Sequence, residues 1–297
     1  MLIETLHQST FWHGRGGTIT HMLSGVDIAL WDLWGQITGL SIGRLLGGRF
    51  REKIRPYASV FMNDLECLQR NLEDAKARGF RSFKIGWYPF GRKDDDELDE
   101  ALVSHAREVI GDDCELMVDA GGSEAFWPHS PKWALEKARM LANYNVTWFE
   151  EPLTPDDMEG YAWLTARAPL PIAGGEVFTR RQSYAPWLAN KSWNFVQPDT
   201  TKCGGLYETF QIARNAAEHG IVWVPHGWNT GVGLAADLQL ASAISGARWI
   251  EYKTPAPFVD ELMVNPPQLD ENGMVDIPDK PGLGFEWSEE AIERFSA

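Results

Sequence analysis

Short apolar runs alternate with stretches of helical pattern along most of this chain. Eight of these runs are expected to form β-strands, and they read PYASVF (56–61), RSFKIG (81–86), CELMVD (114–119), VTWFE (146–150), PIAGGE (171–176), WNFVQPD (193–199), IVWVPH (221–226) and ARWIE (247–251). The last six runs end on Asp, Glu or His, and these ends lie 31, 26, 23, 27 and 25 residues apart. A short strand, a helix and two loops need about that length, so each step predicts one β-α unit.

The stretches between these runs have the pattern of helices. They cover residues 64–78, 95–110, 131–143, 157–166, 181–190, 206–219 and 234–244. Glycines at positions 79, 111, 220 and 246 stand close to the ends of four of them, where helices commonly stop. Strands that alternate with helices form parallel sheets. The pattern therefore predicts an α/β fold, a TIM-type (β/α) barrel.

The two ends of the chain depart from this repeat. Residues 1–48 have a helical pattern, in which Ser24 can cap a helix. The apolar positions from Val26 to Leu33 are too dense for an exposed surface element. The tail from Pro255 is rich in Pro and Gly and is expected to return as a loop segment over another domain.

Composition and charge narrow the class of protein. The 297 residues include 14 Trp and are 44% hydrophobic, enough to fill a barrel that typically needs about 250 residues. A formal charge of −15 disfavours nucleic acid as a partner, and an anionic substrate would need a local cation. Cys67, Cys114 and Cys203 show no CxxC pairing and are expected to be free thiols. Without a leader or a run of about 18 apolar residues, we expect a cytoplasmic protein with no membrane partner.

Three carboxylates are expected to meet at one end of the barrel. Asp119, Glu150 and Glu176 end successive strand runs, and the carboxyl ends of barrel strands open on one face. Carboxylates that close together repel one another unless a cation lies among them. An all-oxygen set suits Mg²⁺, one ion per chain. Taken singly, each acid could instead cap the following helix or pair with a surface Lys.

Four further residues are candidates for proton transfer and charge stabilisation on the same face. Asp199 and His226 end neighbouring runs, so the carboxylate can orient the imidazole and raise its basicity. Lys84, inside an apolar run, is the only Lys expected at a strand end there, and burial would require an anionic partner. Glu251 could be a helix cap or an acid that stays protonated and donates a hydrogen bond to an oxyanion.

Nine motifs follow one another nearly from end to end of the chain. They are SGVDIALWDLWG (24–35), LLGG (45–48), FKIG (83–86), LMVDAG (116–121), WFEEPL (148–153), PIAGGE (171–176), QPDTTKCGG (197–205), VPHGWNTG (224–231) and PDKPGLG (278–284). In their order and spacing the chain resembles the enolase superfamily, specifically its mandelate racemase-like subgroup. The resemblance implies that Asp119, Glu150 and Glu176 hold Mg²⁺, with the first Glu of the EEP motif as the ligand.

The resemblance also implies roles for the other four residues. His226 with Asp199 would remove a proton α to a carboxylate, Glu251 would stabilise the resulting enediolate, and Lys84 would face the substrate carboxylate. The subgroup often has Lys-x-Lys on the second strand, whereas this chain has Lys84-Ile85-Gly86. Since the opposite-face base is missing, racemisation by two bases is disfavoured and elimination stays open.

The resemblance further implies a division of the chain into three parts. Residues 1–53 would be the helical part of an α+β capping domain, 54–254 the catalytic barrel, and 255–297 a segment that returns to the cap. The first strands of the family's capping domain have no counterpart before the first helix. Those strands would normally cover the apolar face of VDIALWDLW (26–34), and an uncovered face promotes association. We therefore expect the 297-residue chain to associate with itself, as a homo-oligomer or an aggregate, and to have weak or no activity on acid sugars.

Three functions are compatible with this sequence. The main expectation is a Mg²⁺-dependent dehydratase that acts on an acid sugar, an aldonate or aldarate, by β-elimination of water. An alternative of the same superfamily is a sugar-lactone cycloisomerase or an epimerase or racemase. An alternative of another class is a truncated, non-catalytic barrel that binds metal.

Overall fold

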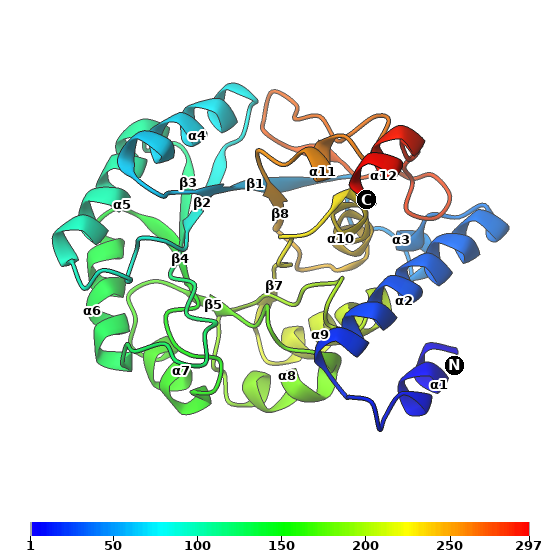
Figure 1. Ribbon diagram of the computed structural model, residues 1–297, viewed down its shortest axis with the longest axis horizontal. Helices are drawn as coiled ribbons and strands as arrows, with labels where there is room; N and C mark the ends of the chain where they lie inside the picture. The colour runs from blue at the N-terminus through cyan, green and yellow to red at the C-terminus, as the bar shows by residue number, and fades with distance from the viewer. Residues whose placement is uncertain (1, 297) are drawn as a thin grey trace.

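The computed structural model describes residues 2–296 and has the architecture of a parallel (β/α) barrel. Its barrel strands are β1 (Lys53–Phe61), β2 (Ser82–Gly86), β3 (Glu115–Asp119), β4 (Val146–Glu150), β5 (Ile172–Gly174), β6 (Phe195–Val196), β7 (Val222–Trp223) and β8 (Trp249–Lys253). The strands pair in parallel in the order β7-β6-β5-β4-β3-β2-β1-β8 and lie round a ring in Figure 1. The predicted α/β barrel fold is confirmed.

The helices of the repeat surround this ring of strands (Figure 1). They are α4 (Leu65–Ala77), α5 (Asp96–Ile110), α6 (Pro131–Ala142), α7 (Met158–Thr165), α8 (Arg180–Ala189), α9 (Leu206–Glu218) and α10 (Gly231–Ala243). Side chains of Asp64, Asp95, Ser130 and Asp157 accept hydrogen bonds from the first turns of α4 to α7, which explains why those helices begin where they do. The predicted starts agree with these helices to within one residue, except that α10 begins three residues earlier than predicted.

Strands β5, β6 and β7 are shorter than the apolar runs that predict them. The chain leaves the sheet after Gly174, Val196 and Trp223. Pro198 and Pro225 lack the N–H that a central strand must donate, and Gly175 has a φ of 115°. As a result, the polar residues that end these runs lie on loops just beyond the strands.

Apolar side chains fill the inside of the barrel below these strand ends. This inner layer consists of Tyr57, Met117, Trp148, Ala173, Phe195, Val224 and Trp249. The ring of Trp148 contacts those of Tyr57 and Trp249, with centroids 5.4 and 5.5 Å apart. Because side chains alternate along a strand, the residue two positions after each member also faces the barrel interior. The layer therefore forms the floor of a site at the carboxyl ends of the strands.

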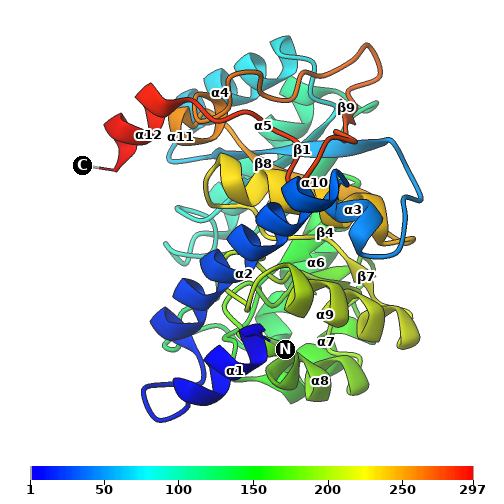
Figure 2. The same cartoon turned by 90° about the vertical axis from the view of Figure 1, so that its right-hand side faces the viewer.

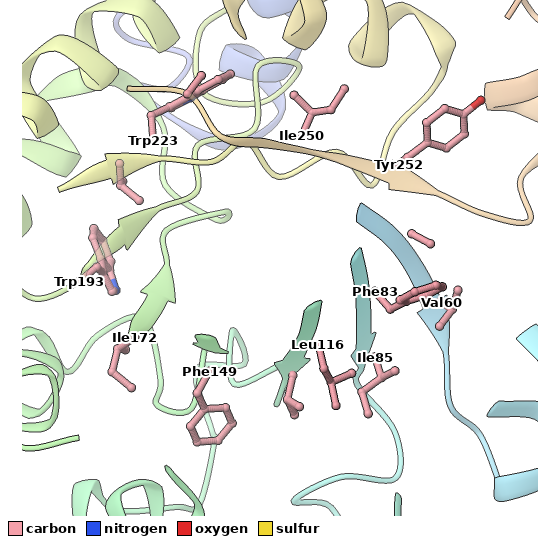
Figure 3. Packing of buried hydrophobic residues seen from close by; sticks show 14 of the residues in the cluster. Val60, Phe83, Ile85, Leu116, Phe149, Ile172, Trp193, Trp223, Ile250 and Tyr252 are labelled. Atoms are coloured by element: carbon pink, nitrogen blue, oxygen red, sulfur yellow. The ribbon is translucent and has the colours of Figure 1, made fainter. Parts of the chain in front are cut away.

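A second, larger apolar cluster lies between the strands and the surrounding helices. Figure 3 shows side chains from this cluster, among them Phe83, Leu116, Phe149 and Ile250. These residues occupy the strand positions that alternate with the inner layer. The strands are therefore buried on both faces, as expected for a parallel sheet, and hold their side chains in fixed directions.

The N-terminal helices differ from the prediction. They are α1 (Leu2–Ser9), α2 (Gly17–Thr38) and α3 (Ile42–Leu45). The prediction that Ser24 caps a helix is wrong, because Ser24 lies inside α2, donates to the Thr20 carbonyl and accepts from Gly204 N–H at 2.9 Å. The dense apolar stretch is also not fully covered, since Val26 and Leu33 are 41% and 55% exposed.

The C-terminal segment runs back to the N-terminal helices (Figure 2). It contains α11 (Pro257–Asp260), β9 (Val275–Asp276) and α12 (Glu289–Phe295), and β9 pairs with β1 in antiparallel fashion. Gly282 N–H donates to the Leu40 carbonyl at 2.9 Å, and Arg44 forms an ion pair with Asp279. These contacts tie the two ends of the chain together, while the division at residues 53 and 254 stays a prediction.

Two expectations from composition can be compared with the structure. Cys67, Cys114 and Cys203 are all free cysteines. Across residues 2–296, none of the helices has both the length and the apolar character that crossing a membrane requires.

Candidate active site

The three predicted carboxylates converge at the carboxyl ends of β3, β4 and β5. Asp119 and Glu150 end adjacent strands in direct register, and Glu176 follows β5 by two residues. One ligand oxygen from each residue lies within 4.8 Å of the other two, and all three residues are buried. Asp119 also accepts a hydrogen bond from Gly121 N–H at 2.7 Å, which fixes its side chain. This oxygen-only cluster could hold a divalent metal ion.

Burial and mutual repulsion raise the pKa values of two acids of the cluster. Burial, followed by repulsion from Glu150, raises the pKa of Asp119 well above its ordinary value. Burial also raises the pKa of Glu176 from 4.5 to about 7, although the nearby His226 opposes that change. Without a metal ion, these acids therefore retain protons that water-exposed carboxyl groups would have lost.

Lys84 is the cation that the structure places among these acids. From β2, its Nζ atom lies 2.5 Å from Glu150 Oε1, 3.0 Å from Glu251 Oε1 and 3.6 Å from Asp119 Oδ2. The expectation that a buried Lys84 requires an anionic partner is met by these contacts. That it faces a substrate carboxylate stays a prediction.

Asp199 and His226 form the pair expected of a base and its orienting carboxylate. His226 Nδ1 lies 2.7 Å from Asp199 Oδ2, and its Nε2 points toward the carboxylate cluster, 3.4 Å from Glu176 Oε2. Burial opposes a charged imidazole, but Glu176, Asp199 and Glu251 outweigh it and raise the pKa of His226 from 6.5 to about 10. The geometry leaves Nε2 as the atom that can exchange a proton with a group beside the cluster.

The surroundings of Glu251 favour its ionised form in the metal-free protein, and the expected part as a protonated hydrogen-bond donor stays a prediction. Burial favours the neutral acid, but the charges of Lys84 and His226 lower the pKa of Glu251 to about 2. Its Oε2 accepts a hydrogen bond from Gly227 N–H at 2.6 Å. The sequence could not reveal this, because Lys84 comes from β2, whereas His226 and Gly227 lie in the loop after β7.

Two polar residues of the site were not predicted. Gln197 Nε2 and Trp148 Nε1 both donate to Glu150 Oε2, at 2.7 and 2.9 Å. Each lies two residues before a predicted site residue, so alternation along a strand could have placed both inside the barrel. Together they hold one oxygen of Glu150 and leave the other to Lys84.

Lys84 is not the only Lys at this end of the barrel. Lys202, in the loop after β6, lies 3.3 Å from Asp199, and Lys253 is the last residue of β8. The prediction of a single Lys is therefore wrong. Its error arises because β8 extends two residues beyond Glu251, where the predicted strand ended.

Gly86 is closely packed against the candidate metal site. A Cβ atom added at this position would lie 2.7 Å from Asp119 Cβ, a distance that real side chains do not reach. A second Lys at position 86 would therefore require Asp119 to move. The packing of Gly86 against Asp119, a predicted metal ligand, thus disfavours an opposite-face base at position 86.

A cavity away from the strand ends contains none of these residues. It has a volume of about 850 Å³ and lies among helices α1, α2 and α9. Its walls are mostly apolar and include Leu30, Trp31, Trp34, Leu46, Tyr207 and Phe210. The candidate site is therefore identified by the chemistry of its side chains rather than by this cavity.

The site and fold agree with the family to which comparisons assign the chain. The family described as Enolase C-terminal domain-like matches residues 68–291. The chain belongs to this family, within the enolase superfamily, whose members typically bind a divalent metal ion.

Three proteins are similar to this chain, and two of them are named as cycloisomerases. The D-galactarolactone cycloisomerase of Agrobacterium fabrum (strain C58) is 36% identical over 296 residues, covering 95% of this chain and 75% of that protein. The crystal structure of the 3,6-anhydro-D-galactonate cycloisomerase from Zobellia galactanivorans is similar with a TM-score of 0.89 and 28% identity, over 99% of this chain and 80% of that one. An enolase superfamily member from Polaromonas sp. JS666 matches with a TM-score of 0.85 and 29% identity, over 98% and 76% of the two chains. The comparisons favour the cycloisomerase alternative over the dehydratase.

The raised carboxyl pKa values predict a pH-dependent affinity for Mg²⁺. Below about pH 7, Glu176 keeps a proton in the metal-free protein, and a metal ligand must lose it. Affinity should therefore rise between pH 6 and pH 8, with protons released on binding. Calorimetry in two buffers of different ionisation enthalpy at each pH measures both quantities. Equal affinity at the two pH values, with no proton release, would contradict this prediction.

Proposed function

We propose that this protein is a metal-dependent cycloisomerase that opens the ring of a lactone or anhydro derivative of a sugar acid. The observation that carries the proposal is the position of His226, whose Nε2 lies 3.4 Å from a carboxylate of the candidate metal cluster. A single base next to a candidate metal site suits removal of the proton α to a substrate carboxylate. The names of the two cycloisomerases in the comparison support this class of reaction.

The substrates named for the two cycloisomerases share one structural feature. In a lactone of galactaric acid and in 3,6-anhydro-galactonate, a ring oxygen is attached to the carbon β to a carboxylate. Removal of the α-proton leaves an enediolate, and its electrons then form a C=C bond while the β C–O bond breaks. The ring oxygen keeps the bonding electrons, and the resulting enol becomes a 2-oxo acid. No water is gained or lost, so the product is an isomer of the substrate.

In this proposal Asp119, Glu150 and Glu176 hold one Mg²⁺ ion. The bound ion supplies the positive charge that stabilises the enediolate. His226 takes the α-proton on Nε2, and Asp199 holds the imidazole in the required orientation.

The other two site residues have supporting parts in the proposal. Lys84, which lies among Asp119, Glu150 and Glu251, would donate hydrogen bonds to the substrate carboxylate. Glu251, ionised and fixed by Gly227, keeps Lys84 and His226 in place through its charge rather than by donating a proton. This role replaces that of a protonated donor.

Cycloisomerisation of a lactone makes smaller demands on the site than dehydration does. Loss of a hydroxyl group as water requires a proton donor, whereas the ring oxygen of a lactone leaves as a stable carboxylate. One base is then sufficient, and position 86, where the subgroup often has a second Lys, is occupied by Gly86 packed against Asp119. Epimerisation and racemisation, which need a base on each face, have less support.

The substrate consumed, rather than the product, distinguishes a cycloisomerase from a dehydratase. A galactaric acid lactone and open galactarate would both give the same 3-deoxy-2-oxo acid. NMR spectroscopy measures the consumption of each compound by the Mg²⁺-loaded protein in separate samples. The measurement must be completed before the lactone hydrolyses spontaneously. We expect the lactone to be consumed and galactarate to persist. Consumption of galactarate alone would identify a dehydratase, and no reaction with either compound or with 3,6-anhydro-galactonate would contradict the proposal.

A further inference from the structure

Lys253 lies at the mouth of the barrel among three aromatic rings. Its Nζ atom is 4.0 Å from the ring centroid of Trp228, 4.7 Å from that of Phe258 and 5.9 Å from that of Phe61. Within residues 2–296, the Nζ atom of Lys253 has no hydrogen-bond partner and no carboxylate at ion-pair distance. The rings attract an ammonium ion, but they offer no hydrogen-bond acceptor to its three N–H donors.

The backbone places Lys253 directly above the candidate active site. Trp249 belongs to the inner layer of the barrel and Glu251 to the site, so alternation along β8 turns Lys253 to the same interior side. Two residues of strand carry it about 7 Å beyond Glu251, toward the open end. Phe61 ends β1 on the neighbouring strand, and its ring packs edge-on against Trp228 with centroids 4.8 Å apart. This cluster of Lys253 and three aromatic residues thus lines part of the opening through which a substrate would enter.

The charges around the site distinguish Lys253 from its neighbours. Lys84 already contacts three carboxylates, and Lys202 contacts Asp199. Lys253 alone among these three keeps an uncompensated charge in a half-buried position. Partial removal of an ammonium ion from water without an acceptor is unfavourable. A ligand that brings an anionic oxygen to this point would relieve that cost.

We propose that Lys253 binds a second carboxyl group of the substrate, remote from the one beside the metal cluster, and so selects dicarboxylic sugar acids and their lactones. This inference rests on the proposed function and extends it to the substrate class. In a lactone of an aldaric acid, the remote carboxyl group is the one bonded to the ring oxygen. When the β C–O bond breaks, its electrons remain on that oxygen and a carboxylate forms. Lys253 then faces an anion that gains charge during the reaction.

A purely structural role of Lys253 would have a different effect on substrate binding. If its ammonium group only holds Trp228, Phe258 and Phe61 together, removing the charge would weaken the binding of every substrate to the same degree. A specificity residue changes the ratio between a dicarboxylate and the matching monocarboxylate. This ratio is therefore the quantity to measure.

Galactarate and galactonate form a suitable pair of probes, since they differ by one terminal carboxyl group. Calorimetry with the Mg²⁺-loaded protein should show tighter binding of galactarate by roughly ten- to a hundredfold. Lys253→Met should reduce this ratio to near one, and Lys253→Arg should restore most of it. Lys280→Met, at an exposed position, serves as the matched control. The same ratio in Lys253→Met as in the unaltered protein, or no preference in the unaltered protein, would overturn the inference.

Binding separates this inference from the proposed function. If galactarate binding depends on Lys253 but no lactone is converted, the cycloisomerase proposal fails and the carboxylate subsite stands. If lactones are converted while Lys253→Met keeps the preference for galactarate, the subsite fails and the activity stands. Thermal unfolding of each variant identifies any that do not fold, and Lys253→Gln then provides a second neutral replacement.

Discussion

Replacing His226 by Asn is expected to stop exchange of the substrate α-proton with deuterated solvent and to lower turnover by about 10²–10⁴-fold. The imidazole Nε2 is directed at the carboxylate cluster, while Nδ1 is held by Asp199 at 2.7 Å. Asn preserves a hydrogen-bonding group there but cannot accept a proton. Proton NMR spectroscopy in deuterated buffer, with Mg²⁺ and the best substrate, measures exchange separately from ring opening.

Two variants complete this experiment. His13→Asn changes an exposed histidine in the loop between α1 and α2, and it should retain the exchange rate of the unaltered protein. Asp199→Asn should slow exchange without abolishing it, because the imidazole stays in place with a less favourable orientation and charge. Exchange in His226→Asn at a rate close to that of the unaltered protein would show that another group removes the proton.

The barrel could be predicted from the sequence because its periodic signals are strong and local. Each strand run is short, apolar and bounded by turn residues, and the caps Asp64, Asp95, Ser130 and Asp157 stand at the beginning of four helices. The convergence of the carboxylates then follows from topology alone, since parallel strands open on one face. That reasoning required the order of the strands but no side-chain detail.

What the sequence did not reveal depends on contacts between distant segments. Ser24 has the side chain of a helix cap, but its partner is Gly204 N–H, 180 residues away. The ionised state of Glu251 depends on Lys84 and His226, which come from two other units of the barrel. The position of Lys253 above the site required the true length of β8. Such features follow from packing, and no local pattern encodes them.

The base and the candidate metal site are electrostatically linked through Glu176. This carboxylate contributes to the raised pKa of His226, and His226 in turn lowers the pKa of Glu176. A divalent ion on Glu176 would neutralise the charge that favours the protonated imidazole. Metal binding is therefore expected to lower the pKa of His226 and prepare the neutral base. The two sites act together, so a change at Glu176 should affect both.

Glu176→Gln is expected to abolish turnover and to weaken Mg²⁺ binding by more than the roughly 10–100-fold typical of losing an outer-sphere partner. The amide keeps the shape of the side chain but removes one of the three charges that attract the ion. Calorimetry with Mg²⁺ measures the affinity, and Glu271→Gln, at an exposed position within the C-terminal segment, is the matched control. Mg²⁺ affinity that stays unchanged in Glu176→Gln would show that the ion binds elsewhere.

Thermal unfolding provides a second test of Glu176→Gln, in which the variant is expected to be more stable than the unaltered protein without metal and less stable with it. Folding raises the pKa of Glu176 from 4.5 to about 7, so the folded state binds this proton more tightly than the unfolded state. In the metal-free protein, Glu176 therefore increasingly disfavours folding as the pH rises from 4.5 to about 7, and the full cost persists above that. Glu176→Gln removes this cost and should unfold at a higher temperature than the unaltered protein at pH 8 with a chelator present. With saturating Mg²⁺ the order should reverse, because only the unaltered protein gains the full binding free energy of the ion. A variant less stable under both conditions would mean that Glu176 supports the fold by itself, without a metal ion.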